Sequence, residues 1–125
     1  MSNVTEDQFG EAERVTAIVS VQNRYSAVDR SSEPMLDVCD QQMLVFIPWA
    51  PLEEASAIPA VIAAARRHRA TERQVALAWL LTRSPQVLPI PGSSNPEHVE
   101  ENAAAASIEL TAKEIRAITL APLSR

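Results

Sequence analysis

The residues best suited to chemistry follow the last short apolar run of the chain. Residues 87–90 form that run, and Gly92 and the small hydroxyl residues Ser93 and Ser94 come after it. Asn95 can cap a helix, and the proline that follows it suits the first helical position. Backbone N–H groups at the start of such a helix point outward and attract anions. The segment therefore predicts a phosphate grip, although the same residues also suit a plain turn.

The elements that must position this grip alternate between helices and strands. Apolar residues at helical spacing predict helices, and short β-branched or apolar runs predict strands. Such alternation indicates parallel strands joined by right-handed crossovers, which fit a small open sheet or part of a (β/α)₈ barrel. In such barrels a phosphate site often follows the last strands. The expected helices are residues 5–15, 32–42, 57–69, 71–84, 95–106 and 111–120, and the expected strands are residues 17–22, 43–49 and 87–91.

Composition and charge exclude several classes of function. The 125 residues carry a net charge of −5, with 11 Lys and Arg against 16 Asp and Glu, so we expect no nucleic-acid partner. Hydrophobic residues make up 46% of the chain, but no apolar stretch is long enough to cross a membrane. The first residues lack the pattern of a signal peptide, and Cys39 is the single cysteine, so we expect a cytoplasmic protein. Neither cysteine nor histidine spacing suggests a metal site.

Five segments, taken in order, resemble the aldo/keto reductase family. The resemblance covers nearly the whole chain and implies that residues 1–125 are the C-terminal part of an aldo/keto reductase domain. The implied fold is a partial (β/α)₈ TIM barrel, with about three parallel strands and surrounding helices. Members of that family reduce aldehydes and ketones with NADPH, and sometimes with NADH. The segments are SN (2–3), VQNRY (21–25), FIPWAPL (46–52), QVALAWLL (74–81), and IPGSS (90–94) leading to EEN (100–102).

The resemblance also implies which residues hold the nicotinamide dinucleotide. It places the nicotinamide carboxamide on Ser2, Asn3 and Gln22, unless the first two belong to a frayed terminus. It places the nicotinamide ring against Trp49, unless this tryptophan is an ordinary core residue. The adenosine phosphate would lie against five residues after the last strand, which are Gly92, Ser93, His98, Glu101 and Asn102.

Two of these positions depart from the family's pattern. The pattern has a lysine where Gly92 stands and an arginine where His98 stands. Losing two permanent charges weakens a grip on a 2′-phosphate. The resemblance implies NADP(H) as the cofactor, and these two departures make NAD(H) the alternative.

No catalytic residue is assigned to this chain. The family's chemistry uses a tyrosine as general acid, a lysine that lowers the pKa of that tyrosine, an aspartate and a histidine. The resemblance places all four in the first half of the barrel. Tyr25 and Lys113 are the single tyrosine and lysine here, and their places in the pattern do not allow them to pair. His68 ends a charged helix, and we expect it to be solvated.

The sequence is compatible with a reductase fragment, with a non-enzymatic interaction module, and with a small regulator. A partial barrel leaves strand edges and an apolar inner face uncovered. The chain is therefore expected to be marginally stable alone, to self-associate, or to need a complementary N-terminal half, as one piece of a split reductase would. The alternatives are a non-enzymatic interaction module, or a small α/β regulator for which no motif is visible. The carbonyl substrate is not indicated by the sequence.

Overall fold

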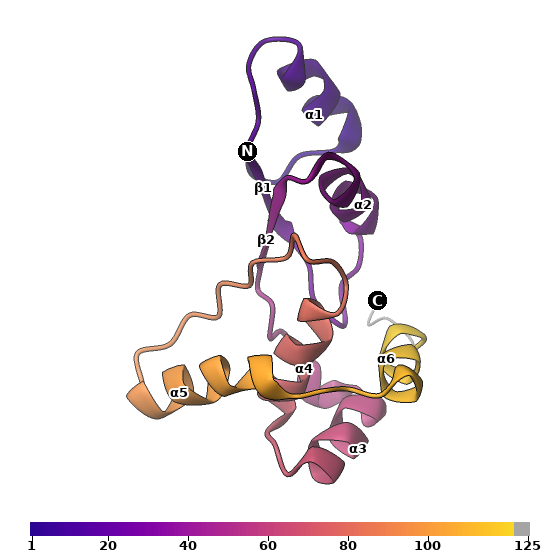
Figure 1. Cartoon of the computed structure of the whole chain (residues 1–125), viewed down its shortest axis with the longest axis vertical. Helices are drawn as coiled ribbons and strands as arrows, with labels where there is room; N and C mark the ends of the chain where they lie inside the picture. The colour runs from indigo at the N-terminus through magenta and orange to yellow at the C-terminus, as the bar shows by residue number, and fades with distance from the viewer. Residues whose placement is uncertain (122–125) are drawn as a thin grey trace.

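A pair of parallel strands lies at the centre of the chain (Figure 1), in a computed structural model that describes residues 1–121. Strands β1 (Ser20–Arg24) and β2 (Val45–Trp49) pair with Val21 opposite Phe46. Near the sheet lie α1 (Glu6–Glu13) and α2 (Glu33–Gln42), which contact each other. The remaining helices gather at the other end of the molecule (Figure 1). They are α3 (Pro59–His68), α4 (Glu72–Leu81), α5 (Pro96–Ala104) and α6 (Ala112–Thr119), with the short 3₁₀ turns η1 (Ala55–Ala57) and η2 (Ala105–Ser107).

Helix ends are set by local sequence signals. In three helices a threonine hydroxyl accepts a hydrogen bond from the backbone N–H three residues on. The Gln or Glu side chain at that position accepts a hydrogen bond from the threonine N–H in return. Asn95 caps α5 and a proline opens that helix, as the sequence predicts. Met43 and Arg69 end α2 and α3 in the left-handed conformation, with φ of 56° and 52°. The three threonine pairs are Thr5–Gln8, Thr71–Gln74 and Thr111–Glu114.

The third strand expected over residues 87–91 does not form, so the prediction of three strands is wrong. The backbone of Val87 makes one isolated parallel bridge to Phe46, and the N–H of Leu88 donates to the Phe46 carbonyl at 2.8 Å. Pro89 and Pro91 have no N–H to donate, so the ladder cannot continue past this point. The fold is therefore α/β, and its sheet has two parallel strands with one isolated bridge on each side.

The chain start forms the other bridge and is not frayed. Ser2 bridges Gln22 in parallel, the Asn3 N–H donates to the Gln22 carbonyl at 2.9 Å, and the Gln22 N–H donates to the Met1 carbonyl at 2.8 Å. In addition, the side-chain amide of Asn23 bonds both backbone groups of Val4. Across the sheet, the neighbouring segments are thus the chain start at Ser2, then β1, then β2, then the segment at Val87.

Three aromatic side chains join the sheet to the helices. Tyr25 stacks on Trp79 with ring centroids 6.0 Å apart, and it meets the edge of Phe46 at 5.8 Å. All three side chains are fully buried, as is Cys39. Burying each large apolar side chain contributes about 1.5–3 kcal/mol, so this cluster anchors α4 against β1 and β2.

The helices α3 and α6 are joined by a polar contact. His68 Nε2 lies 3.2 Å from the Glu114 carboxylate, and both side chains are largely buried. The expectation of a solvated His68 is therefore wrong, because α6 packs over the end of α3. Within residues 1–121, every helix is too short or too polar to cross a bilayer.

Candidate cofactor site

The first group of predicted residues lies along one side of the sheet, from the middle of β1 to the end of β2. Ser2 lies opposite Gln22 in the backbone bridge, so these two and Asn3 share one edge of the sheet. Trp49 is the last residue of β2, and its indole N–H donates to Asn3 Oδ1 at 2.8 Å. The structure therefore brings Ser2, Asn3, Gln22 and Trp49 together, although Ser2 and Trp49 lie 47 positions apart in the chain.

The ring of Trp49 has a cationic neighbour that sequence reasoning did not identify. The Arg24 guanidinium carbon lies 5.7 Å from the ring centroid. Arg24 is held by Glu53, which accepts from its Nε at 3.0 Å, and by an ion pair with Asp29 at 3.4 Å. The hydrogen bond and charge of Glu53 raise the pKa of Arg24. No local pattern predicts this contact, because Arg24 and Trp49 belong to different strands.

One residue of the second group, Gly92, lines a pocket of about 370 Å³. One wall is the loop after β2, residues 50–53, and the other is the segment 90–92. Arg73, in the first turn of α4, also lines it. Because Ala50 follows Trp49 directly, this pocket begins next to the first group of residues. Ala50 has a φ of 51°, a strained conformation for a residue with a side chain.

Gly92 leaves its side of the pocket open. A Cβ placed at Gly92 would meet no described atom within 4 Å, and the glycine has no positive φ. Neither backbone strain nor close packing therefore requires a glycine at this position. The absent side chain leaves space beside the loop.

The loop after Gly92 is organised by its own hydrogen bonds. Ser93 Oγ accepts from the Asn95 N–H at 3.1 Å, and Asn95 Oδ1 accepts from the Glu97 N–H at 3.0 Å. In this capping bond the Glu97 N–H, one of the helix N–H groups expected to attract an anion, already donates to Asn95. These bonds account for the shape of the turn, so the loop by itself does not establish a phosphate grip.

The remaining predicted residues lie on α5. His98, Glu101 and Asn102 are all partly buried. The Glu101 carbonyl accepts from Gln74 Nε2 at 3.0 Å, which fixes α5 against the start of α4. Asn102 Oδ1 is buried and has no hydrogen-bond partner among residues 1–121.

Comparison with known proteins identifies the family. Residues 1–121 match the model of the aldo/keto reductase family. This chain belongs to the aldo/keto reductase family. The resemblance of the five sequence segments is thereby confirmed, and the match favours an oxidoreductase over an interaction module or a regulator.

Individual aldo/keto reductases and other oxidoreductases resemble the chain over almost its full length. It is 44% identical to an uncharacterised oxidoreductase of Schizosaccharomyces pombe, over 90% of this chain and 38% of the relative. It is 40% identical to the pyridoxine 4-dehydrogenase of Escherichia coli, over 89% of this chain and 40% of that enzyme. A crystal structure of a Klebsiella pneumoniae aldo-keto reductase in complex with NADPH superimposes with a TM-score of 0.86 and 29% identity, over 99% of this chain and 48% of that one. The chain thus spans less than half the length of these relatives.

Two unpartnered polar atoms, one on the pocket wall and one on α5, fit groups of a nicotinamide dinucleotide. Arg73 Nε and Asn102 Oδ1 are buried without hydrogen-bond partners in the described chain. Buried polar atoms are normally satisfied, so such atoms indicate sites where a ligand can bond. An arginine N–H suits a phosphate oxygen, and an amide oxygen suits an amino group such as that of adenine. Arg73 and the open space at Gly92 lie in the same pocket and suit a phosphate group, while Asn102 lies on α5 outside the pocket lining.

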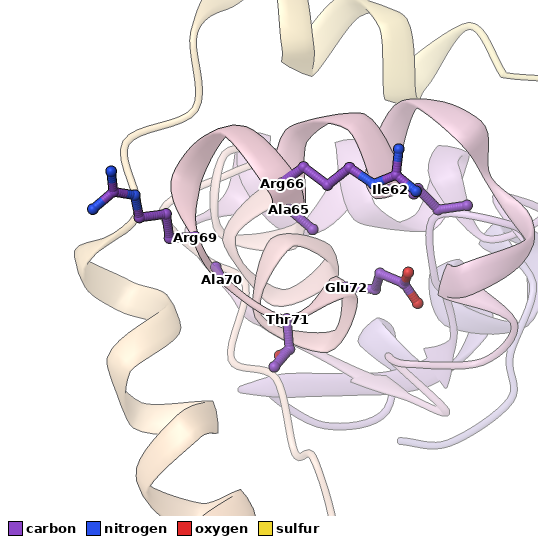
Figure 2. A pocket seen from close by; sticks show the side chains of 7 residues that line it. All are labelled: Ile62, Ala65, Arg66, Arg69, Ala70, Thr71 and Glu72. Atoms are coloured by element: carbon purple, nitrogen blue, oxygen red, sulfur yellow. The ribbon is translucent and has the colours of Figure 1, made fainter.

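A second hollow, of about 400 Å³, does not have these properties (Figure 2). It lies where α3 ends and α4 begins, and none of the predicted cofactor residues lines it. Figure 2 shows Arg66 extending toward Ile62 while Arg69 points away from the hollow. Because the two guanidinium groups diverge, they do not form a common site for an anion.

Tyr25 is a structural residue in this fold. Its hydroxyl donates to Glu33 Oε2 at 2.5 Å and accepts from Arg83 Nε at 3.2 Å, and its ring is fully buried. Burial, followed by the hydrogen bond to Glu33, raises the pKa of Tyr25. A general acid needs a pKa near the working pH, so this environment is unsuited to proton donation. Lys113 lies apart from it, in the first turn of α6 beside a small cavity against α3.

Proposed function

We propose that this chain provides the nicotinamide-dinucleotide binding surface of an aldo/keto reductase-type oxidoreductase. The observation that carries the proposal is the pocket formed by residues 50–53 and 90–92, directly after Trp49, in a chain that matches the family over residues 1–121. The proposed fold of the complete domain is a (β/α)₈ barrel, of which this chain is the C-terminal part. NADP(H) is the proposed cofactor, and NAD(H) is the alternative.

The first group of residues is proposed to hold the nicotinamide end. Ser2, Asn3 and Gln22 would bond the carboxamide, and Trp49 would stack against the ring. The hydrogen bond from the Trp49 indole to Asn3 supports this arrangement, because it fixes the ring relative to the carboxamide-binding amide. When bound, the reduced nicotinamide supplies a hydride to a carbonyl carbon.

The second group is proposed to hold the adenosine phosphate end. Gly92 and Ser93 would border the phosphate, while His98, Glu101 and Asn102 would face the adenosine. The buried, unpartnered Asn102 Oδ1 supports this, since a donor from a ligand would satisfy it. The bond between Gln74 and the Glu101 carbonyl keeps α5 in place for this role.

The proton donor is proposed to come from a segment other than the one described. Tyr25 is buried in a hydrogen-bonded pair with Glu33, and Lys113 lies on α6, so neither supports carbonyl protonation. We propose that a complementary N-terminal half, carrying the tyrosine and lysine of the family, completes the barrel. Self-association is the alternative way to cover the backbone edges at residues 2 and 87.

Cofactor titration tests the proposal. NADPH added to the chain is expected to quench the emission of Trp49, with heat released in a parallel calorimetric titration. Trp49→Phe should abolish the optical change and leave the buried Trp79 as the remaining emitter. Absence of both signals up to about millimolar cofactor contradicts the proposed function. Turnover of a generic aldehyde by the pure chain would contradict the assignment of the proton donor to another segment.

A further inference from the structure

We infer that Arg73 binds a phosphate group of the dinucleotide, an inference that rests on the proposed function. Arg73 is the second residue of α4 and lines the same pocket as Gly92, although it lies 19 residues earlier in the chain. None of the five matching sequence segments contains it. Its assignment therefore comes from the fold alone.

The hydrogen-bonding state of Arg73 indicates a ligand. Its Nε is buried and has no hydrogen-bond partner among residues 1–121, and no ion pair of the described chain includes it. A buried donor without a partner destabilises a protein unless a ligand or water satisfies it. A guanidinium presents several N–H groups in a planar fork that matches the oxygens of a phosphate.

The charges around the pocket leave Arg73 as the cation available to an anion. Glu53 is the other ionisable side chain that lines the pocket, and its Oε2 is paired with Arg24. That pairing removes the carboxylate that would otherwise compete for Arg73. A phosphate in the pocket would thus meet one uncompensated positive charge.

The wall of the pocket opposite Arg73 has open space and no positively charged side chain. Gly92 has no side chain, and nothing described lies within 4 Å of the position its Cβ would take. His98 is not among the residues that line this pocket. The positive charge therefore comes from α4, across the pocket from the loop that the sequence analysis identified as the phosphate grip.

Binding measurements on charge-matched variants test this inference. We compare the full chain with Arg73→Met, Arg73→Lys and Arg116→Met, titrating each with NADPH and NADH by calorimetry. Arg116 is exposed on α6, so its substitution removes the same charge away from the pocket. Arg73→Met is expected to weaken binding about tenfold, Arg73→Lys to restore part of that loss, and Arg116→Met to change little.

The two dinucleotides distinguish which phosphate is bound. A loss confined to NADPH assigns Arg73 to the adenosine 2′-phosphate, whereas an equal loss for both assigns it to the shared pyrophosphate. If Arg73→Met binds both cofactors as tightly as the unmodified chain, the inference is wrong while the proposed function stands. If the unmodified chain binds neither, the proposed function fails and the inference fails with it.

Discussion

Replacing Glu114 with glutamine removes a charge that joins α6 to α3. Glu114 Oε2 accepts from the N–H and hydroxyl of Thr111, at 2.8 and 2.7 Å, and lies 3.2 Å from His68 Nε2. Its other oxygen pairs with Arg67 at 3.2 Å, and the carboxylate side chain is 8% exposed. The variant keeps an acceptor for the Thr111 N–H but loses the negative charge.

The pKa of Glu114 gives the sign of the pH effect. Burial alone would raise this pKa, but the hydrogen bonds from Thr111, followed by the contact with His68, outweigh burial and lower the pKa from 4.5 to about 2. A group with a lowered pKa stabilises the fold above its unfolded pKa. Its contribution is therefore complete above pH 4.5 and is lost as the pH falls toward 2.

The size of the loss follows from the bonds that change. A hydrogen bond to a charged group contributes about 1.5–3 kcal/mol, and a neutral one about 0.5–1.5 kcal/mol. The Arg67 side chain is 62% exposed, so water screens its pair with Glu114. We expect Glu114→Gln to lower the free energy of unfolding by about 1–2 kcal/mol at pH 7.

Urea denaturation followed by circular dichroism, at several pH values, measures this loss. The difference between the original chain and Glu114→Gln should be largest near pH 7 and should shrink between pH 4.5 and 2. Glu109→Gln is the matched control, since Glu109 is exposed and its substitution removes the same charge. A difference of constant size from neutral to acidic pH would refute the electrostatic reasoning, because it would show that shape or packing causes the loss.

Three further predictions follow from single positions. Met43→Gly should stabilise the chain by about 0.5 kcal/mol in urea denaturation, because Met43 is 79% exposed and ends α2 with a φ of 56°; a lower midpoint would contradict this. Gly92→Lys should raise affinity for NADPH over NADH about threefold to tenfold in cofactor titrations, because the position has space for the side chain and the added charge would face the proposed phosphate. Equal changes for both dinucleotides would count against that role. Trp79→Phe should lower the free energy of unfolding by about 2–3 kcal/mol, because it removes the 3.0 Å bond from the indole to Thr119 and leaves a gap beside Tyr25; a melt unchanged from that of the original chain would argue against the cluster as an anchor.

Several features of the fold were predictable because they depend on neighbours in the chain. The cap at Asn95 was predicted from adjacent residues, and the capping box at Thr111 and Glu114 likewise depends on residues three positions apart. The strands at 20–24 and 45–49 were expected as strands, with limits displaced by a few residues. Strand limits depend on pairing with another segment, which local patterns do not contain. The prolines at 89 and 91 were the available signal against a third strand.

The candidate site was predictable only in part. Residue types alone suggested the loop at Gly92, and family resemblance supplied the other cofactor positions, whose roles stay predictions. The contact of Asn3 with Trp49, the cation of Arg24 over that ring, and the position of Arg73 all required the folded chain. Each joins segments separated by tens of residues.

Helix starts, the parallel direction of the strands and the family resemblance could be predicted from the residues, because these depend on local spacing and on ordered motifs. Which polar atoms lack partners became visible only in the folded chain. Glu53 is neutralised by Arg24, while Arg73 Nε and Asn102 Oδ1 remain unsatisfied within the described chain. Whether a charge is compensated depends on every segment that folds around it, so no local stretch of residues can settle it.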